Sequence, residues 1–401
     1  MIFNNKHIDY SSKSKKDLYG NLFLFYLISN KYIVYIGKKI LDFLILIRLP
    51  ISYIIKKTVF KYFCGGETIK ESRNTISNLG RNNIKTVLDY SIEGKQDENS
   101  FSNTYNEILN NLDEAYNNSL IPFSVFKITG LARYQLLEKL NNKIYSQAYT
   151  ELLTSEEIKE FNLIIYRLNT IGSKGLKLNI PILIDAEESW IQNTIDYLIE
   201  NLISSINTKK AIVFNTIQLY RIDKLNYLKK LHADAVKNKY KLGVKLVRGA
   251  YMEKEHRRAI ANQYLSPIHT QKEDCDNDFN TACTYCLNHI DTISIFFGTH
   301  NELSTSMITT IMKDKKISKN DHRIYFSQLL GMSDNITFSL AKKGYNTAKY
   351  VPYGPVKEVI PYLIRRAEEN SAISGQTNKE IIRIREALDT YYSHVDSMDK
   401  S

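Results

Sequence analysis

The feature that most constrains the fold is an alternation of short β-branched or aromatic runs with longer amphipathic runs from residue 86 onward. Eight of the short runs have the length and composition of buried strands, and helix-like stretches separate them. Such an order is typical of parallel strands joined by helices, and eight strands favour closure into a barrel. The predicted strands are 86–90, 123–128, 179–185, 211–216, 243–247, 293–298, 323–327 and 347–351.

The stretches between these strands are predicted to be helices, and the first 80 residues lack any alternating strand pattern. The predicted helices are 101–117, 156–171, 189–204, 218–237, 278–289, 301–312, 334–343 and 356–370. We therefore expect an α/β chain in three parts. Residues 1–80 form an N-terminal helical arm broken at Cys64-Gly65-Gly66, residues 81–375 form a (βα)8 TIM-like barrel, and residues 376–401 form a C-terminal helix and tail.

The main alternative to the barrel is an open, doubly wound sheet. That fold usually carries a Gly-rich phosphate-binding turn after its first strand. The stretch after Tyr90 reads Ser-Ile-Glu-Gly-Lys, which is not such a turn. The barrel is therefore the favoured architecture.

Nearly every predicted strand ends in a polar or charged residue. In a barrel of this kind, the carboxyl ends of the strands meet at one face, where the active site lies. The residues at these ends are Glu93, Lys127, Asp185, Gln218, Lys245, Arg248, Thr299, His300, Gln328 and Tyr350. Surface loops are polar too, but they do not so regularly begin on the last strand residue. A shared cleft is therefore predicted.

The helix predicted after Gly354-Pro355 has an unusual polar face. Tyr362, Arg365, Arg366 and Glu369 follow i, i+3, i+4 and i+7 spacing, so they project from one side. Arginine binds a carboxylate through two parallel hydrogen bonds, so an adjacent pair beside a tyrosine suits a small carboxylate ligand. A solvated face with an Arg–Glu pair is the alternative for this helix taken alone.

Charge and cysteine usage exclude several function classes. The chain has 54 Lys and Arg against 43 Asp and Glu, a net charge of +11, but no clustered basic stripe. Nucleic-acid binding is therefore not expected. Cys283 and Cys286 form a lone CxxC without a second pair, which favours buried structural thiols over a metal site.

Residues 21–60 are apolar but interrupted by charges, and no run reaches the roughly 18–20 apolar residues of a membrane span. The first residues show no secretory signal, and no Arg- and Ser-rich leader is present. These patterns favour a cytoplasmic protein with peripheral contact at the inner membrane, and the matrix side of a mitochondrion is the alternative. A basic, non-catalytic module that binds membranes through residues 21–60 is a further alternative from a different class.

Seven segments at these strand ends, in the same order, resemble the proline dehydrogenase family of flavin-dependent enzymes. The resemblance covers roughly residues 85 to 375. It is closest to the single-function branch, because the chain has no room for a second, aldehyde dehydrogenase domain. The matching segments are FKITG (126–130), LIDAEESW (183–190), NTIQLY (215–220), KLVRGAY (245–251), GTHN (298–301), QLLGM (328–332) and residues 349–370.

The resemblance implies a function and a set of roles. FAD is the implied cofactor and L-proline the implied substrate, oxidised to 1-pyrroline-5-carboxylate, with a quinone or other acceptor receiving the electrons. Lysine 245 matches a basic residue near the reactive nitrogen of the flavin. The residues implied to touch the substrate or orient those that do are Lys127, Asp185, Glu93, Tyr350, Tyr362, Arg365 and Arg366. Those implied to touch FAD are Gln218, Lys245, Arg248, Gly249, Ala250, Thr299, His300, Gln328 and Glu369.

Two details of the implied site depend on side-chain size and position. Hydroxyproline-using relatives carry a smaller residue where Tyr350 stands, so its ring indicates proline, and a proline analogue or another small cyclic amine is the alternative. No nucleophile or metal is required, because the flavin carries the chemistry and the protein orients the substrate. Trp190 is predicted to pack a helix, and Glu187 is predicted to be a first-turn helix charge.

Overall fold

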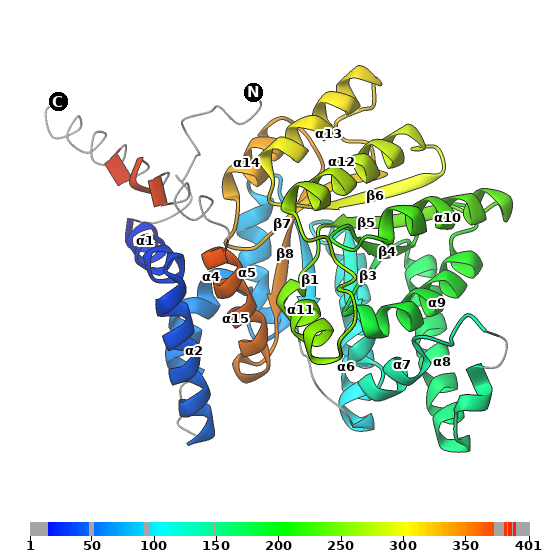
Figure 1. Ribbon diagram of the computed structural model, residues 1–401. Helices are drawn as coiled ribbons and strands as arrows, with labels where there is room; N and C mark the ends of the chain where they lie inside the picture. The colour runs from blue at the N-terminus through cyan, green and yellow to red at the C-terminus, as the bar shows by residue number, and fades with distance from the viewer. Residues whose placement is uncertain are drawn as a thin grey trace, which may run out of the picture.

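The computed structural model describes residues 15–47, 52–91, 97–146, 149–372, 381–382, 384–386 and 388–389. Eight parallel strands pair in sequence order, and β8 closes the barrel against β1 (Figure 1). The predicted (βα)8 barrel is confirmed. The strands are β1 (Lys85–Tyr90), β2 (Phe123–Lys127), β3 (Ile182–Asp185), β4 (Val213–Gln218), β5 (Leu242–Val247), β6 (Ile293–Gly298), β7 (Ile324–Leu329) and β8 (Thr347–Tyr353).

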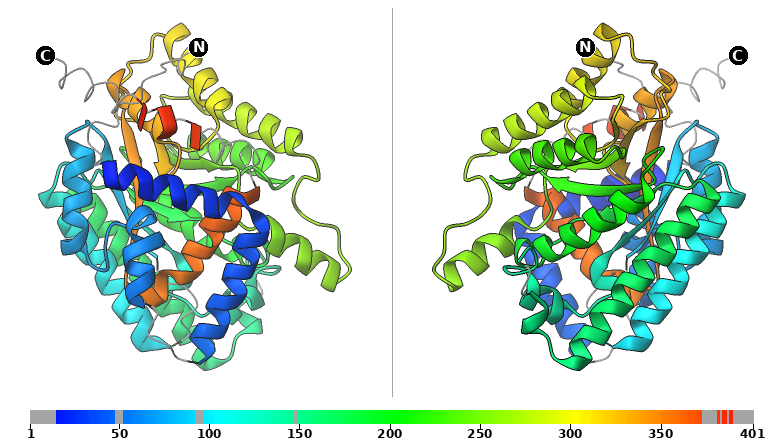
Figure 2. Two further views of the ribbon diagram at one scale, coloured as in Figure 1. Left: turned by 90° about the vertical axis from the view of Figure 1, so that its left-hand side faces the viewer. Right: turned by 90° about the vertical axis from the view of Figure 1, so that its right-hand side faces the viewer.

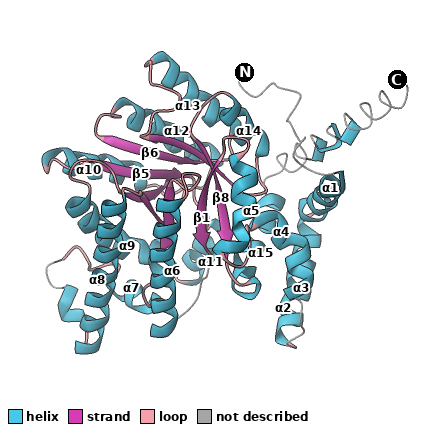
Figure 3. Cartoon of the chain, turned by 180° about the vertical axis from the view of Figure 1, so that it is seen from behind, coloured by secondary structure: helices cyan, strands magenta, loops and turns pink. Residues whose placement is uncertain are grey.

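Helices surround the strands on the outside of the barrel (Figure 3). A large apolar core of Ile, Leu, Val and Phe side chains fills the space between the two layers. The α-helices of the barrel are α5 (Ile69–Gly80), α6 (Glu98–Asn117), α7 (Tyr134–Leu140), α8 (Ser155–Leu178), α9 (Ser189–Ile206), α10 (Lys224–Lys237), α11 (Met252–Ala261), α12 (Lys272–Asn288), α13 (Glu302–Asp314), α14 (Asp334–Lys342) and α15 (Val356–Ala372). Two short 3-10 helices, η2 (Ile128–Gly130) and η3 (Tyr149–Leu152), follow β2 and α7.

Several predicted boundaries differ from the observed ones, and three of them have a local reason. The strand predicted from residue 179 begins at Ile182, because Asn179 ends α8 in a left-handed conformation (φ 60°). The helix predicted to end at residue 171 continues to Leu178 as α8. Its glycines are helical residues that allow close packing, because a Cβ on Gly175 would lie 2.5 Å from the Ile182 side chain. The helix predicted from residue 218 begins at Lys224, because Gln218 is still paired in β4.

The interior of the barrel is filled by aromatic side chains below its carboxyl-end face. The ring of Phe123 packs edge-on against Phe214, Phe296 and Tyr325, with centroids 4.8–5.8 Å apart. Such a plug makes the barrel a packed core instead of a pore. Any ligand site inside the barrel must therefore lie above this layer.

The N-terminal arm is helical in its described part and packs against α15 (Figure 2). Its helices are α1 (Lys15–Ser29), α2 (Lys31–Leu46), α3 (Ser52–Ile55), the π-helix η1 (Lys56–Phe60) and α4 (Lys61–Phe63). None of the helices within the described ranges is both long enough and apolar enough to cross a membrane. Of residues 376–401, those described between 381 and 389 have a helical backbone.

The predicted break at Cys64-Gly65-Gly66 is confirmed, and it fastens the arm to the barrel. The Gly65 amide donates to the Pro352 carbonyl (2.8 Å), and Gly66 forms a β-bridge with Tyr353. The Glu67 carboxylate then accepts a hydrogen bond from the Val356 amide (3.2 Å) at the start of α15. The passage from arm to barrel therefore holds both the end of β8 and the first turn of the helix after it.

Candidate active site

A cavity of about 320 Å³ lies at the carboxyl ends of the strands. The structure brings together there all the predicted site residues except Glu93 and Glu369. Glu93 lies outside the described residues. Glu369 belongs to α15, but its side chain is not described.

The floor of this cavity is a layer of charged side chains directly above the aromatic plug. In several strands an inward apolar residue is followed, two positions later, by an inward polar one, as in Val125 and Lys127 or Leu183 and Asp185. Alternate residues of a strand point to the same side, so the inward side chains change from apolar to polar over two residues. The last inward side chains are the ones that a ligand meets.

Lys245, Asp185 and Tyr350 form one buried unit on this floor. The Lys245 ammonium lies 2.6 Å from an Asp185 oxygen and 3.1 Å from the Tyr350 hydroxyl. That hydroxyl is within hydrogen-bond distance of both Asp185 oxygens, at 2.8 and 2.9 Å. Burial, followed by the negative charge of Asp185, raises the pKa of Tyr350 well above its usual range, so the phenol stays protonated and donates. The unit fixes a positive charge and an aromatic wall at one position.

Asp89 on β1 is a site residue that the sequence prediction missed. It is buried, lines the cavity and accepts a hydrogen bond from the Ser91 hydroxyl (2.6 Å). Burial and repulsion by Asp185 raise its pKa to about 6, although Lys127 opposes the shift. The available signal was strand parity: Val87 points into the barrel, so Asp89 does as well.

Glu187 was predicted to be a charge at a helix N-terminus, and it does lie just before α9, but its carboxylate bonds to Thr129 and not to the helix. It precedes α9, is buried, and accepts hydrogen bonds from the amide (3.0 Å) and hydroxyl of Thr129. Burial raises its pKa to about 7, against the opposing charge of Lys127. Lys127 is the last residue of β2, and Glu187 therefore ties the segment that follows this strand to the loop after β3.

Helix α15 closes the cavity from above with Tyr362, Arg365 and Arg366. Tyr362 and Arg366 are buried, and the Arg366 guanidinium lies 5.2 Å from the centroid of the Tyr362 ring. The predicted placement of these side chains on one helical face is confirmed. Together with Lys127 they bring three cationic side chains to one cavity.

A second group of predicted residues is held by hydrogen bonds at the strand ends β4 to β7. Arg248 donates to Asp276 (2.6 Å), Thr299 (2.9 Å) and Ser304 (2.9 Å). Its guanidinium also lies 4.3 Å from the Phe279 ring centroid. Because so many partners fix it, Arg248 presents a rigid positive charge to the cavity.

Gln218 and Gln328 tie neighbouring loops together. The amide of Gln218 donates to the Glu187 carbonyl (2.8 Å), and that of Gln328 donates to the Thr299 carbonyl (3.0 Å). The Gln328 oxygen accepts from the Thr337 hydroxyl (2.7 Å). These bonds set the spacing of the strand ends on which a planar ligand can lie.

Gly249 gives the backbone after β5 a shape that no other residue allows. Its φ is +146°, and a Cβ there would lie 2.4 Å from the Tyr220 ring. Ala250 and Tyr251 follow and line the cavity. Tyr251 was also missed, although it ends one of the segments that carry the resemblance. At Gly249 the cavity wall is therefore bare backbone, which a ligand can approach closely; we call it the Gly249 cradle.

His300 lies in the cavity wall and bonds through Nδ1 to the Ser333 hydroxyl (3.0 Å). Burial, Lys349, Arg366 and Arg248 lower its pKa to about 3. A group with so low a pKa is a poor proton acceptor near neutral pH. This favours the predicted hydrogen-bonding role over that of a general base.

The residues on this side of the cavity fit an anionic, planar dinucleotide such as FAD. The Gly249 cradle admits a ligand close to the backbone, and Lys245 and Arg248 supply positive charge. The Ser327 hydroxyl is buried in the lining without a hydrogen-bond partner among the described residues, which suits a ligand that provides one. Within the described ranges, no cluster of three or more His, Cys, Asp or Glu is placed to hold a metal ion.

Comparisons with known proteins find similar chains. A family model described as "Proline dehydrogenase" matches residues 72–379. "Proline dehydrogenase 1, mitochondrial" of Dictyostelium discoideum is 32% identical over 96% of this chain and 75% of its own length. The corresponding Arabidopsis thaliana protein is 30% identical over 82% and 74%. "Carbapenem antibiotics biosynthesis protein CarD" of Pectobacterium carotovorum subsp. carotovorum is 32% identical over 80% of each chain.

Solved structures agree with the fold. Proline utilization A (PutA) of Bdellovibrio bacteriovorus superposes with a TM-score of 0.71 at 19% identity, over 91% of this chain. That of Bradyrhizobium japonicum superposes with a TM-score of 0.65 at 19% identity, over 82% of this chain. The chain spans 38% and 32% of the lengths of these two proteins.

Proposed function

The chain belongs to the proline dehydrogenase family, and from that premise we propose that it oxidises L-proline to 1-pyrroline-5-carboxylate with FAD as cofactor and a quinone or other acceptor as the final oxidant. One observation carries the proposal. Lys127, Arg365 and Arg366 share a cavity whose aromatic walls are Tyr350 and Tyr362. Three cations and two rings are the groups that a zwitterion with one carboxylate and an apolar ring requires.

The cations bind the substrate carboxylate and so fix one end of the ring. Guanidinium groups suit this task, because they bind carboxylate through paired hydrogen bonds of fixed geometry. Asp185 and Asp89 offset the repulsion among so many positive charges on the cavity floor. Binding at both ends orients the substrate. Orientation strongly affects the rate, because a ~1 Å misplacement can lower it about 10²-fold.

When bound, FAD would supply the hydride acceptor for the ring carbon beside the nitrogen. Lys245 holds a positive charge on the cavity floor beside Asp185, where it would favour negative charge that develops in a water-excluded site. Arg248, Thr299, His300 and Gln328 form the wall against which the cofactor lies. The substrate nitrogen loses its proton to solvent before binding, so the neutral His300 needs no proton-transfer role.

A proline analogue or another small cyclic amine is the second candidate substrate. A relative that is 32% identical is named for carbapenem biosynthesis, and this supports the alternative. The bulk of Tyr350, buried beside Lys245 and Asp185, supports proline itself. Turnover of proline, hydroxyproline and ring-substituted prolines by one preparation separates the two.

The proposal also includes contact with a membrane surface, where a quinone is available. Exposed apolar side chains on α1 to α3 support it, with lysines among them that suit anionic lipid. They include Phe23, Tyr32, Tyr35, Ile36, Tyr53 and Ile54. Flotation with anionic vesicles tests this: Ile36→Glu with Ile40→Glu should release the protein, whereas Ile260→Glu on the exposed surface of α11 should not.

Two of the relatives are named as mitochondrial proteins, which supports the matrix-side alternative for the location. Cell fractionation decides between this and the cytoplasm. For the reaction itself, the experiment is an anaerobic titration of purified protein with L-proline, followed by flavin absorbance. Bleaching is the expected result. A colourless preparation that cannot be reconstituted with FAD contradicts the proposal.

A further inference from the structure

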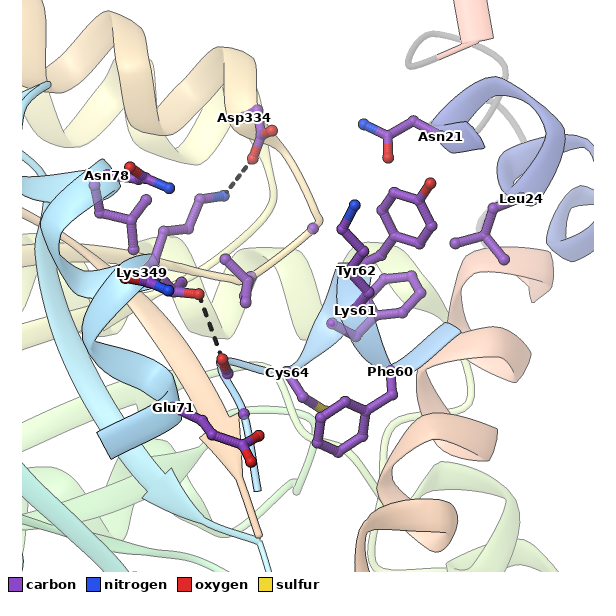
Figure 4. Close-up of a pocket in the computed structure, with 18 of the residues that line it drawn as sticks. Asn21, Leu24, Phe60, Lys61, Tyr62, Cys64, Glu71, Asn78, Asp334 and Lys349 are labelled. Carbon is purple, nitrogen blue, oxygen red and sulfur yellow. Dashed lines mark hydrogen bonds and ion pairs between the residues drawn. The ribbon is translucent and has the colours of Figure 1, made fainter. Parts of the chain in front are cut away.

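A second cavity, of about 790 Å³, lies between the arm and the barrel (Figure 4). Its walls come from α1, the passage through residues 60–66, α5, the loop after β7, and β8. Pockets that bind compact organic ligands enclose about 300–1,000 Å³. The size alone is therefore that of a ligand site, and none of the roles assigned above uses it.

The lining of this arm cavity combines apolar and polar parts. Leu24 and Phe60 form an apolar part on the arm, with Asn21 beside it. The barrel supplies a polar side with Asn78 and the ion pair of Lys349 with Asp334, whose charged atoms lie 2.9 Å apart (Figure 4). A cavity divided in this way suits a ligand with a polar head and an apolar tail.

Asn21 gives independent support for a ligand. Its side chain is only 5% exposed and lines the cavity from α1 (Figure 4). The side-chain oxygen has no hydrogen-bond partner among the described residues. A buried oxygen without a hydrogen bond is unfavourable, so a ligand hydroxyl placed there is favoured.

The arm cavity shares a wall with the active site. At the end of β7, Gln328 and Leu329 line the active site, whereas Leu330 and Gly331, in the loop that follows, line the arm cavity. The Lys349 ammonium donates hydrogen bonds to the Leu329 (3.2 Å) and Met332 carbonyls and so fixes this wall in place. The same division holds along β8, because neighbouring strand residues point to opposite faces: Tyr350 faces the active site and Lys349 the arm cavity.

We propose that the arm cavity binds the electron acceptor, a quinone, with its ring beside the Lys349–Asp334 pair and its tail along the apolar side of the arm. This inference rests on the proposed function. Oxidation of the amine to the imine releases two electrons and two protons, and a quinone takes up the same two electrons and two protons to become a quinol. The Lys349 ammonium stabilises negative charge on the ring oxygens, and Asn21 accepts from a quinol hydroxyl.

The route of the ligand into the cavity follows from α1. This helix carries Leu24 in the cavity wall, and its neighbours Phe23 and Leu27 are exposed. A lipid-dissolved quinone therefore meets the exposed apolar face of the helix whose other face lines its site. In this arrangement one face of α1 contacts the membrane and the other face lines the acceptor site.

The first test fills the cavity from the arm side. Leu24→Trp should raise the KM for a benzoquinone bearing a decyl tail by about tenfold or more, because the larger ring occupies the site of the tail. Anaerobic bleaching by L-proline should keep its wild-type rate. Leu27→Trp is the matched control on the exposed face of the same helix, and both kinetic constants should stay unchanged.

A second pair of variants covers the case in which Leu24→Trp does not fold. Asn78→Trp fills the cavity from α5, and Ser77→Trp places the same ring on the exposed surface next to it. The inference is overturned if the quinone KM of a folded Asn78→Trp or Leu24→Trp equals that of the wild type while proline bleaching is normal. Absence of proline bleaching in the wild-type protein is a different result, because it contradicts the proposed function.

A direct readout does not depend on turnover. An azido-substituted quinone is photolysed with the protein, and the modified peptides are identified by mass spectrometry. Label on residues 18–26, 60–66 or 74–82 that an excess of the decyl quinone removes supports the inference. Label confined to the peptides around Tyr251 and Tyr350 overturns it, because the quinone would then share the proline site.

Discussion

The ammonium group of Lys245 lies 2.6 Å from the carboxylate of Asp185, and this ion pair joins β5 to β3 across β4. Both side chains are largely buried, at 9% and 15% exposed. Removing one partner of a buried pair leaves an uncompensated charge. Asp185→Asn should therefore lower the free energy of unfolding by about 3 kcal/mol.

The control for this prediction is an exposed ion pair in the same protein. Asp113 lies 2.7 Å from Lys174 and is 56% exposed. Asp113→Asn should cost less than about 1 kcal/mol. Urea unfolding of both variants gives the comparison. Equal losses would mean that the Lys245–Asp185 pair is already well solvated.

The arginines of α15 should act on substrate affinity. Arg365→Met or Arg366→Met should raise the KM for proline by an amount equivalent to roughly 2–5 kcal/mol of lost binding, because each removes a desolvated partner of the carboxylate. Arg257→Met, at a side chain that is 73% exposed on α11, should leave the KM unchanged. Steady-state kinetics with a fixed acceptor concentration measures this, and an unchanged KM in both α15 variants contradicts binding of the substrate carboxylate by Arg365 and Arg366.

Tyr350 should set the choice between proline and hydroxyproline. Tyr350→Ser removes the ring and leaves a small hydroxyl, so proline should lose kcat/KM and hydroxyproline should gain relative to it. Tyr350→Phe keeps the wall but removes the hydrogen bonds to Asp185 and Lys245. It should weaken turnover without changing the preference. A similar substrate ratio in Tyr350→Ser and the wild type would exclude a steric role for the ring.

The raised pKa of Asp89 predicts a pH dependence of stability. Between 3.8, the usual value, and about 6, the folded chain binds a proton at Asp89 that the unfolded chain has released. Stability from this group is therefore lost as the pH rises through that interval. The wild type should lose stability relative to Asp89→Asn from about pH 4 to pH 6, and the difference should level off above.

Ser91 provides an internal check on that assignment. Its hydroxyl donates to Asp89 at 2.6 Å and holds the pKa of the carboxyl down. In Ser91→Ala the interval over which stability is lost should extend to higher pH. Chemical unfolding at several pH values measures both effects, and a difference between wild type and Asp89→Asn that does not vary with pH would show that Asp89 is not the group that titrates.

Gly249 should be needed for the cofactor cradle. Gly249→Ala places a Cβ 2.4 Å from the Tyr220 ring at a φ of +146°, so the loop must shift. Gly344→Ala is the control, because φ is also positive there (+84°) but nothing lies within 4 Å. It should cost only about 1 kcal/mol of backbone strain. Bound flavin per chain, from the absorbance spectrum, should fall in the first variant alone.

Strand parity decided which parts of the site were predictable from the sequence. The order of strands and helices was enough to predict the barrel. The positions of the strand ends were enough to predict that Lys127, Asp185 and Tyr350 lie together. Asp89 was missed because the first site residue was sought after the strand instead of at its last inward position. Counting in steps of two from Val87 would have found it.

Contacts between distant segments were beyond the reach of sequence patterns. The partners of Arg248 come from α12 and α13 and from the loop after β6, and no periodicity links them. The arm was predicted to be helical, but helical spacing does not say which barrel element it covers. The cavity between Leu24 and Asp334 follows only from the packed structure.

The hydrogen bond from the Val356 amide to Glu67 links the arm to the helix that closes the substrate site, although none of the arm's described residues lines that site. Glu67 sets where α15 starts, and α15 sets where Arg365 and Arg366 stand. Deleting the chain up to Glu67 would therefore blunt discrimination among amino acids before it affected the barrel. An N-terminal truncation is therefore expected to change specificity as well as length.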